Sequence, residues 1–415
     1  MSSFLLKNAR ISDVNSSWHG KTADLLITDG VISKIQEGIT NSEIDEIDLH
    51  GAFLSPSWMD SFATLPDPGS SWKQSINNFK ENAREGGFIE VVCLCGDDPL
   101  PQKPAMLTSI IKSNQQGSTN ILPIALASED KLGKEMTEIF EMKNAGAVAI
   151  SDGIVNSMSM GLKTKLLEYC ASLNIPLMIH PFAQNLVNGG QIHEGEISVN
   201  LGLKGIPYAA ETTKLLEDIE LAKWLKTPLV VLGISSKSSV DIIRKAKTDG
   251  VKVKAVVPIL NLVYDDSSLE NFNEEFKVLP PLRSASDRLA LIEGLIDGTI
   301  DGICSNHTPQ DIESKKREFP YSEFGASVIS EFPRFIANLI QKGKVDSDLI
   351  LSKLYHGNRI IFNQKYTPIE VGNIANITGF SMSESSNYQS NKPYNLVTFE
   401  GITAGVVFQY SKGSK

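Results

Sequence analysis

The side chains of this sequence that could take part in chemistry stand at the ends of short apolar runs. Asp152, His180 and Asn306 each end such a run, and His307 directly follows the last of them. Histidine and aspartate bind metal ions and transfer protons, whereas an asparagine amide only donates and accepts hydrogen bonds. If the runs are neighbouring parallel strands, these four residues meet at one edge and form the candidate site.

The spacing of the apolar runs predicts the elements that would position these side chains. Strands that alternate with helices of 10–15 residues indicate βαβ units and a parallel sheet. Eight such units over about 250 residues suit a closed (β/α)₈ barrel of the TIM type, which carries its site at the C-terminal ends of the strands. We therefore expect an α/β protein with a barrel over residues 51–368. The eight runs span residues 53–62, 88–96, 120–128, 147–152, 175–180, 227–235, 252–258 and 300–306.

The two ends of the chain have a different pattern from the middle. Residues 1–50 contain alternating strand patterns around an Asp29-Gly30 turn, and residues 369–415 again contain short strand patterns. We expect these two segments to form one small, β-sandwich-like domain beside the barrel.

Composition and charge exclude several classes of protein. The formal net charge is −10, which argues against nucleic acid as a partner, because phosphate binding needs a basic face. No apolar run approaches the roughly 20 residues that cross a bilayer, and we expect no secretory signal at the start. The four cysteines, Cys93, Cys95, Cys170 and Cys304, are too few for a disulfide framework in 415 residues. We expect a cytoplasmic protein that binds neither membranes nor nucleic acid.

Several longer segments, taken in order, carry a family resemblance. The chain resembles the dihydroorotase branch of the amidohydrolase superfamily over almost its full length. The resemblance implies a hydrolase of cyclic amides in pyrimidine biosynthesis, with zinc to polarise the ring carbonyl and a carboxylate to shuttle the proton. The segments are LSPSWMDSFATLPDPG (54–69), NLGLKGIPYAAE (200–211), FKVLPPLRSASDR (276–288), LIEGLIDGTIDGICSNHTPQ (291–310), KKREFPYSEFG (315–325) and GNIANITGF (372–380).

The sequence departs from the family pattern at the metal-binding positions. Phe62 and Thr64 stand where the family has the two histidines of strand one, and Gly233 stands at the histidine of strand six. Asn306 occupies the position of the catalytic aspartate, and an amide is not a usable base near neutral pH. Of the usual ligands only His180 is clearly retained. Since zinc needs at least three ligands, we expect no zinc and assign no catalytic residue.

The positions that the family uses for the substrate are also altered. Pro66 and Leu279 replace an arginine and an asparagine that hold the substrate carboxylate, and Gln310 replaces a further histidine. His307 is retained. Asp152 aligns with either of two adjacent aspartates of the family, because one residue is missing there.

Three interpretations follow from the sequence. In the first, the chain is a catalytically inactive dihydroorotase homologue. It acts as a structural or regulatory partner of aspartate carbamoyltransferase or of an active dihydroorotase, or it forms a homodimer. His180, Asp152, Asn306 and His307 are then the remnant of a substrate pocket. In the second, it is an active dihydroorotase or another cyclic amidohydrolase with a rebuilt site, with zinc as cofactor. In the third, the remnant binds a small molecule without metal. Among the other histidines, only His193 falls in a loop near the predicted site.

Overall fold

Eight parallel strands form a closed barrel in the computed structural model, which describes residues 3–40, 43–115, 117, 119–154, 158–383 and 402–411. They form two sheets of four, in the orders β6-β7-β8-β9 and β10-β13-β14-β15. Single bridges from Ile150 to Leu177 and from Ala63 to His307 join the sheets at both edges. The predicted (β/α)₈ fold is confirmed. The strands are β6 (Trp58–Leu65), β7 (Phe88–Cys95), β8 (Asn120–Ala125), β9 (Ala149–Ile150), β10 (Met178–Ile179), β13 (Leu229–Leu232), β14 (Val253–Pro258) and β15 (Gly302–Cys304).

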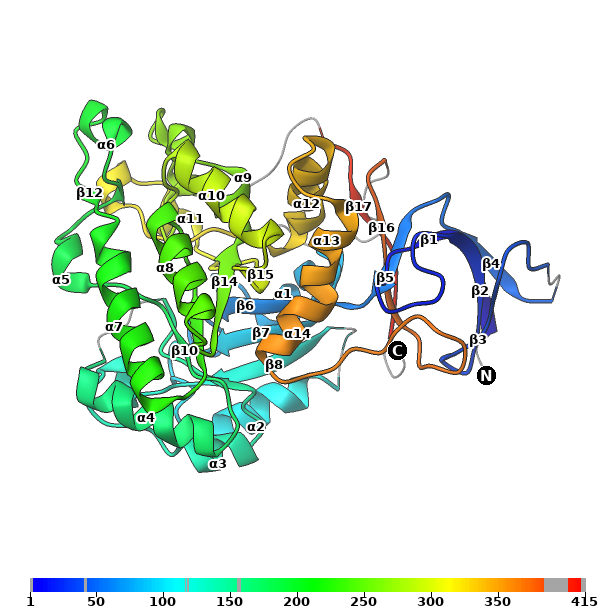
Figure 1. The fold of residues 1–415 in the computed structure, drawn as a ribbon, viewed down its shortest axis with the longest axis horizontal. Helices are drawn as coiled ribbons and strands as arrows, with labels where there is room; N and C mark the ends of the chain where they lie inside the picture. The colour runs from blue at the N-terminus through cyan, green and yellow to red at the C-terminus, as the bar shows by residue number, and fades with distance from the viewer. Residues whose placement is uncertain are drawn as a thin grey trace.

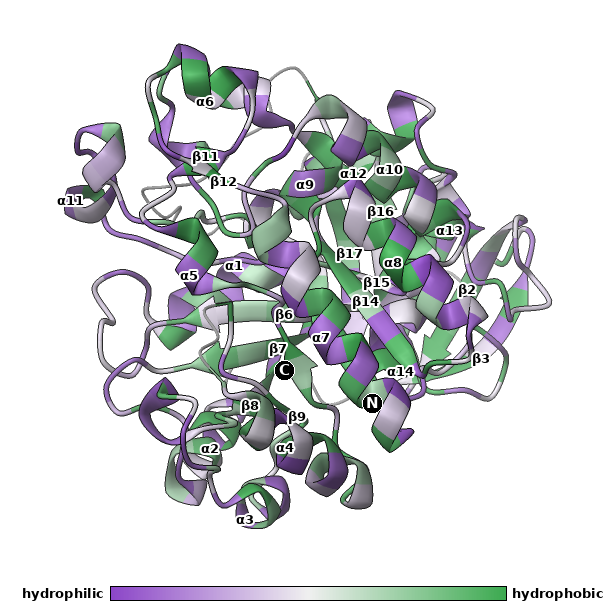
Figure 2. Cartoon of the chain, turned by 60° about the vertical axis from the view of Figure 1, so that its left-hand side comes forward, coloured by the Kyte–Doolittle hydropathy of each residue, from purple (hydrophilic) through white to green (hydrophobic). Residues whose placement is uncertain are grey.

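Helices surround the barrel (Figure 1), and four of the longer ones, α1, α4, α8 and α10, begin at serine caps. The hydroxyls of Ser75, Ser159, Ser236 and Ser284 each accept a hydrogen bond from a backbone N–H of the first helical turn. In Figure 2, α7 and α8 show alternating polar and apolar stripes, as expected for helices that cover a barrel. None of the described helices is long and apolar enough to cross a membrane. The helices of eight or more residues are α1 (Ile76–Glu85), α2 (Pro104–Ser113), α4 (Met160–Ser172), α7 (Ala209–Leu225), α8 (Lys237–Thr248), α10 (Ala285–Ile296) and α12 (Phe332–Gln341).

Shorter elements lie mostly in the loops at the strand ends. Two-residue strands β11 (Ile192–His193) and β12 (Gly205–Ile206) pair with each other in the loop after β10. Short 3₁₀ turns cover 129–131, 266–269, 274–276, 319–321 and 329–331, and a π turn covers 353–357. The short helices are α3 (Ile139–Asn144), α5 (Gln184–Val187), α6 (Glu196–Asn200), α9 (Ile259–Val263), α11 (Ile312–Lys315), α13 (Ser347–Ser352) and α14 (Asn358–Ile361).

Strands from both ends of the chain share a separate seven-stranded sheet, on the right of Figure 1. Its order is β17-β16-β5-β1-β2-β3, and β4 pairs in parallel with β1. The sheet has an apolar cluster of its own, which includes Leu25, Leu54 and Ile377. Its strands are β1 (Ser3–Ile11), β2 (Thr22–Thr28), β3 (Val31–Gln36), β4 (Asp45–Asp48), β5 (Phe53–Pro56), β16 (Asn376–Ser381) and β17 (Gly405–Ser411).

The apolar run at 53–62 belongs to both sheets rather than to one strand. It divides at Ser57, between β5 of the terminal sheet and β6 of the barrel. The Ser57 N–H donates to the carbonyl of Asn376, and the Arg359 guanidinium donates to both the carbonyl and the hydroxyl of Ser57. Arg359 also pairs with Glu90 at 2.6 Å. These contacts fix the chain where it passes from one sheet to the other.

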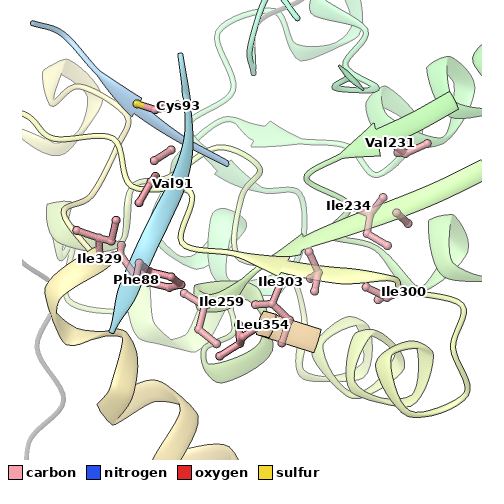
Figure 3. Packing of buried hydrophobic residues seen from close by; sticks show 14 of the residues in the cluster. Phe88, Val91, Cys93, Val231, Ile234, Ile259, Ile300, Ile303, Ile329 and Leu354 are labelled. Carbon is pink, nitrogen blue, oxygen red and sulfur yellow. The ribbon is translucent and has the colours of Figure 1, made fainter. Parts of the chain in front are cut away.

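Two apolar layers hold the barrel together. One lies between the strands and the surrounding helices, and Figure 3 shows part of it around Phe88, Ile259 and Leu354. The other fills the inside of the barrel with side chains such as Phe62, Val230 and Val256. Because side chains fill its inside, the barrel is a packed core and not a channel. All four cysteines are buried and free.

Asn358 ties together the seam where the last strand of the barrel meets the first. Its amide nitrogen donates to the carbonyls of Met59 (2.6 Å) and Ile303 (2.8 Å), and its amide oxygen accepts from the Ile303 N–H at 3.0 Å. The side chain is fully buried. A Cβ on Gly302 would come within 2.2 Å of the Asn358 amide oxygen, so the neighbouring glycine makes room for this contact.

We predict that Asn358→Ala lowers the free energy of unfolding by about 2–4 kcal/mol, because it leaves buried backbone groups of both strands without partners. Urea denaturation measures the change. Asn200→Ala, at an exposed position of α6, is the control and should stay within about 0.5 kcal/mol of the parent. Equal stabilities of the two variants would contradict the role given to Asn358.

Candidate functional site

The predicted site residues do gather at the C-terminal end of the barrel, which we call the mouth. His180 follows β10, Gly233 follows β13, and Asn306 follows β15. A Cβ on Gly233 would lie 3.2 Å from Nδ1 of His180 and 3.4 Å from Pro280. The Asn306 side chain donates to the Leu279 carbonyl at 2.9 Å. The segment Leu279-Pro280 therefore lies between the His180–Gly233 pair and Asn306.

His180 is a neutral imidazole with one free acceptor. Its Nδ1 donates to the Leu232 carbonyl at 2.9 Å, and its ring stacks on Phe182. Burial lowers the pKa of His180, so the ring carries no charge near neutral pH. Its Nε2 is buried and has no hydrogen-bond partner among the described residues. Between His180 and His307, it is the ring nitrogen that no described protein group engages.

The positions that correspond to the other metal-binding histidines offer no comparable donor. Phe62 is fully buried in the apolar layer inside the barrel. The Thr64 hydroxyl donates to the His307 carbonyl and to the Thr308 hydroxyl, both at 3.1 Å. Gly233 has a φ of +71°, a conformation that residues with a Cβ rarely adopt. Any side chain at Gly233 would be strained as well as crowded against His180.

Asn306 occupies the mouth as a neutral hydrogen-bonding group. It is 9% exposed, with its amide nitrogen bonded to Leu279 and its amide oxygen without a partner among the described residues. Leu279 itself packs with an apolar cluster that contains Phe182 and Ile206. Asn306 therefore presents an acceptor to the mouth but cannot take up a proton there.

His307 is held entirely by groups of the protein. Its Nε2 donates to Oε1 of Gln74 at 2.7 Å, and its Nδ1 accepts from the Val328 N–H at 3.0 Å. Burial lowers the pKa of His307 to about 3. Since both ring nitrogens are engaged, His307 positions the loop after β15.

Asp152 is likewise enclosed by the protein. One carboxylate oxygen accepts from the backbone N–H groups of Ala127 and Ser128, each at 2.9 Å, and the other accepts from the Ser128 hydroxyl. Burial raises the pKa of Asp152, and these hydrogen bonds offset only part of that effect. Asp152 therefore holds the loop after β8.

The three remaining positions of the family comparison serve the loops around the mouth. Pro66 accepts a backbone hydrogen bond from Ser70 in the loop after β6. Gln310 accepts from Lys73 Nζ at 2.7 Å and donates to the Phe324 carbonyl. Pro66, Gln310 and Leu279 are all uncharged, so none of these three positions offers a positive charge to a substrate carboxylate.

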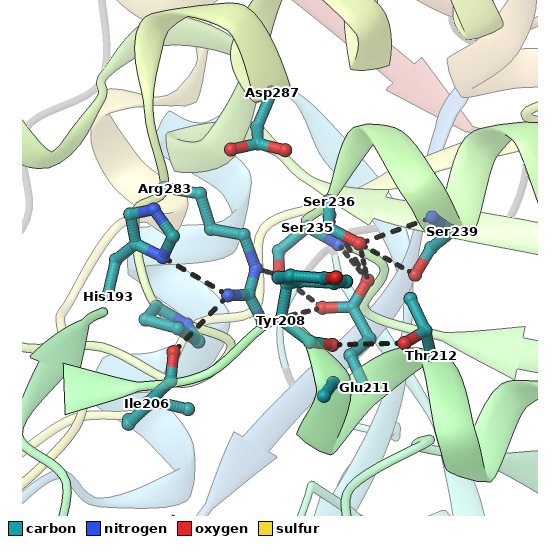
Figure 4. Close-up of polar contacts among 12 residues, drawn as sticks. His193, Ile206, Tyr208, Glu211, Thr212, Ser235, Ser236, Ser239, Arg283 and Asp287 are labelled. Atoms are coloured by element: carbon teal, nitrogen blue, oxygen red, sulfur yellow. Dashed lines mark hydrogen bonds and ion pairs between the residues drawn. The ribbon is translucent and has the colours of Figure 1, made fainter. Parts of the chain in front are cut away.

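Sequence reasoning missed a buried charged cluster beside the mouth, shown in Figure 4. Arg283 pairs with Glu211 at 3.2 Å and donates to the Ser235 hydroxyl at 2.7 Å. Glu211 also accepts from the backbone N–H groups of Ser235 and Ser236, at the start of α8. Burial would raise the pKa of Glu211, but Arg283 and the Ser235 donors lower it below its ordinary value. Arg283 Nη1 also lies 3.3 Å from Nδ1 of His193, which places His193 in this cluster.

A second carboxylate that the sequence did not single out is Asp60 on β6. It is fully buried and accepts hydrogen bonds from the backbone N–H and the hydroxyl of Ser305. Burial raises the pKa of Asp60 to about 7. This contact links β6 to the end of β15. The only signal in the sequence is the place of Asp60 at the start of DSFAT (60–64), within the first segment that carries the family resemblance.

The described residues contain no group of three or more histidine, cysteine, aspartate or glutamate side chains placed to hold a metal ion. At the mouth, the free acceptors described above are Nε2 of His180 and Oδ1 of Asn306. Because zinc sites in proteins use at least three protein ligands, these residues do not fit zinc.

Comparisons with known proteins agree on family and fold. A family model described as "Dihydro-orotase-like" matches residues 51–239. A dihydroorotase of Ruminiclostridium cellulolyticum is 33% identical over 408 residues, covering 96% of this chain and 95% of that protein. One of Acetivibrio thermocellus is 34% identical over 390 residues, covering 94% and 91%. The solved L-hydantoinase (dihydropyrimidinase) from Arthrobacter aurescens has a TM-score of 0.85 at 19% identity, covering 100% of this chain and 96% of that one, which shows a shared fold.

We predict that His307 makes the protein less stable in mild acid. Its pKa is depressed in the folded state, to about 3, while the unfolded chain titrates near its usual value of about 6.5. The unfolded state therefore takes up the proton first, and stability present above pH 6.5 is lost as the pH falls. Between pH 7 and pH 5 the free energy of unfolding should fall by about 2 kcal/mol more in the parent than in His307→Gln.

Urea denaturation at a series of pH values measures this difference. His50→Gln, at an exposed position of the terminal sheet region, is the control and should keep the pH dependence of the parent. A His307→Gln variant with the same pH dependence as the parent would show that the ring is not held neutral.

Proposed function

Because the chain belongs to the dihydroorotase-like family, we propose that it is a pyrimidine-biosynthesis homologue that has lost catalysis and acts as a structural or regulatory partner. Its partner would be aspartate carbamoyltransferase or an active dihydroorotase. The observation that carries the proposal is the state of the mouth. Of the side chains at the expected metal-ligand positions, only His180, with Nε2, and Asn306, with its neutral amide oxygen, keep an atom without a partner among the described residues.

The chemistry of the donor set supports the loss of the metal. Zinc would supply the charge that polarises the amide carbonyl and acidifies a bound water. Phe62 has no donor atom, Gly233 has no side chain, and the Thr64 hydroxyl is occupied within the protein. The amide oxygen of Asn306 is a neutral and weaker ligand than a carboxylate. His180 alone would hold the metal too weakly for stoichiometric occupancy.

The proton-transfer chemistry is missing from the mouth in a similar way. Asn306 stands at the position where the family's aspartate shuttles the proton, and its amide is not a base near pH 7. Asp152 is consumed by backbone and hydroxyl donors, and Asp60 is fully buried against Ser305. Without a Lewis acid and without a free base, a cyclic amide would not be hydrolysed at a useful rate.

The substrate carboxylate would also lack a partner. Pro66 and Leu279 carry no charge, and the nearby Arg283 is committed to Glu211. A carboxylate that loses its charge-assisted hydrogen bonds is not compensated for its desolvation. Binding and chemistry are thus weakened together, while the barrel around them keeps its packed layers and its closed strands. A fold kept without its chemistry suits a role that uses the surface of the protein.

We predict that the purified protein contains no stoichiometric zinc and neither forms nor hydrolyses dihydroorotate. Elemental analysis by mass spectrometry and an absorbance assay of dihydroorotate measure the two properties. The dihydroorotase of Acetivibrio thermocellus, prepared in the same medium, is the control for metal supply and for the assay. Stoichiometric zinc in the parent, together with turnover that His180→Ala abolishes, would establish the rebuilt active site instead.

We predict further that the protein forms a specific complex, either with itself or with an enzyme of pyrimidine biosynthesis. A stable contact of this kind buries about 1,200–2,000 Å² in total. Light scattering of the purified protein measures the homodimer. Affinity capture of the tagged chain from its own cells, with mass spectrometry for aspartate carbamoyltransferase and dihydroorotase, measures the other complexes. A strict monomer that captures neither enzyme would overturn the partner role.

A further inference from the structure

A cavity of about 530 Å³ opens at the end of the barrel opposite to the mouth. It is bordered by the last turns of α4, α8 and α14, by the residues just before β10, and by the first residues of β13 and β14. Figure 1 labels these elements except β13. The mouth residue Gly233 follows the other end of β13, about 13 Å away for four residues of extended strand. The apolar layer inside the barrel lies between the two ends. The cavity is therefore separate from the family's site.

The walls of this cavity are mostly apolar and of a size that suits a small ligand. Leu177, Val230 and Val253 line it from the strands, and Cys170 and Ile361 line it from the helices. Protein interiors are normally close-packed, because an empty apolar space loses contacts on one side. Small-molecule sites typically have volumes of about 300–1,000 Å³ and mainly apolar walls. The cavity has the properties of a binding site for an apolar body such as one or two rings.

The charged groups at the edge of the cavity favour an anion. Three lysines, Lys247, Lys252 and Lys254, line it, against a single carboxylate, Asp301. Asp301 is 2.7 Å from Lys247 and so neutralises one of the three. The Lys254 ammonium donates to the neutral carbonyl of Ile360, so Lys254 shares Asp301, the single carboxylate that lines the cavity, with Lys247.

Lys252 is exposed and makes no ion pair with any described residue. The edge of the cavity thus carries three lysines against one carboxylate, in a chain whose formal net charge is −10.

We propose that this cavity binds a small amphipathic anion, with its apolar body between Leu177, Val230 and Val253 and its anionic group at Lys252 and Lys254. The proposal is independent of whether the mouth is catalytic, because no residue of the cavity belongs to the mouth. Apolar burial would supply most of the affinity, and the two lysines would select for the negative charge.

Two fluorescent probes test both halves of the proposal on the full-length protein. Anilinonaphthalene sulfonate carries two ring systems and one anionic group, and N-phenyl-1-naphthylamine has the same rings without the sulfonate. We expect the anionic probe to bind with one-to-one stoichiometry and roughly five- to tenfold more tightly than the neutral probe, as expected for one or two accessible ion pairs. Equal affinities would overturn the assignment of an anion.

Site variants locate the bound probe. Lys252→Glu/Lys254→Glu should remove the preference for the anionic probe and leave the neutral one unchanged. Lys34→Glu/Lys204→Glu makes the same change of charge at exposed positions away from the cavity and should have no effect. Ala171→Trp, on the wall formed by α4, should abolish binding of both probes, with thermal unfolding as the check on folding.

Ala171→Phe, a smaller intrusion at the same wall position, supplies a second variant if Ala171→Trp fails to fold. This variant should weaken the binding of both probes. Unchanged binding in a folded Ala171→Trp or Ala171→Phe variant would place the probes elsewhere and overturn the proposal.

Discussion

The structure depends on closing the barrel at two seams that each rest on little backbone pairing. Single bridges, from Ile150 to Leu177 and from Ala63 to His307, are the pairings that join the two four-stranded sheets. At the seam between β15 and β6, hydrogen bonds of buried polar side chains take the place of the missing backbone–backbone hydrogen bonds. Asn358 bonds to backbone groups of β6 and β15, and Asp60 holds the chain just after β15. A buried polar contact is costly to leave unmade, so these ties are strong constraints on the closure.

The cost of leaving buried polar groups unpaired also explains why His307 and Asp152 are kept, whatever the mouth does chemically. His307 and Asp152 retain residue types that could act on a substrate, but each has its polar atoms engaged by the protein. Removing either would leave buried backbone donors unpaired in a neighbouring loop. Their retention therefore follows from folding and does not require catalysis. Of the four residues predicted for the pocket, His180 and Asn306 each keep a buried polar atom without a partner among the described residues.

Much of the fold could be predicted from the sequence. The alternation of apolar runs with segments of helical periodicity can be recognised from residues that are close together in the chain. The division of the 53–62 run could not be, because it depends on Asn376 and Arg359, which lie far along the chain. The Glu211–Arg283 pair was missed for a similar reason. It joins residues 72 positions apart, and neither residue has a local pattern that separates a buried pair from two solvated charges.

The backbone at Gly233 bears on whether a histidine could stand at this position. Its left-handed conformation is open to glycine, and any other residue costs roughly 1–2 kcal/mol there before the contact with His180 is counted. A histidine at this position would therefore have to follow a rearrangement of the loop after β13. An exchange of histidine for glycine here would take one substitution, whereas the reverse would also take the change of the loop. On the evolutionary scale, exchange at this position is easier toward glycine than away from it.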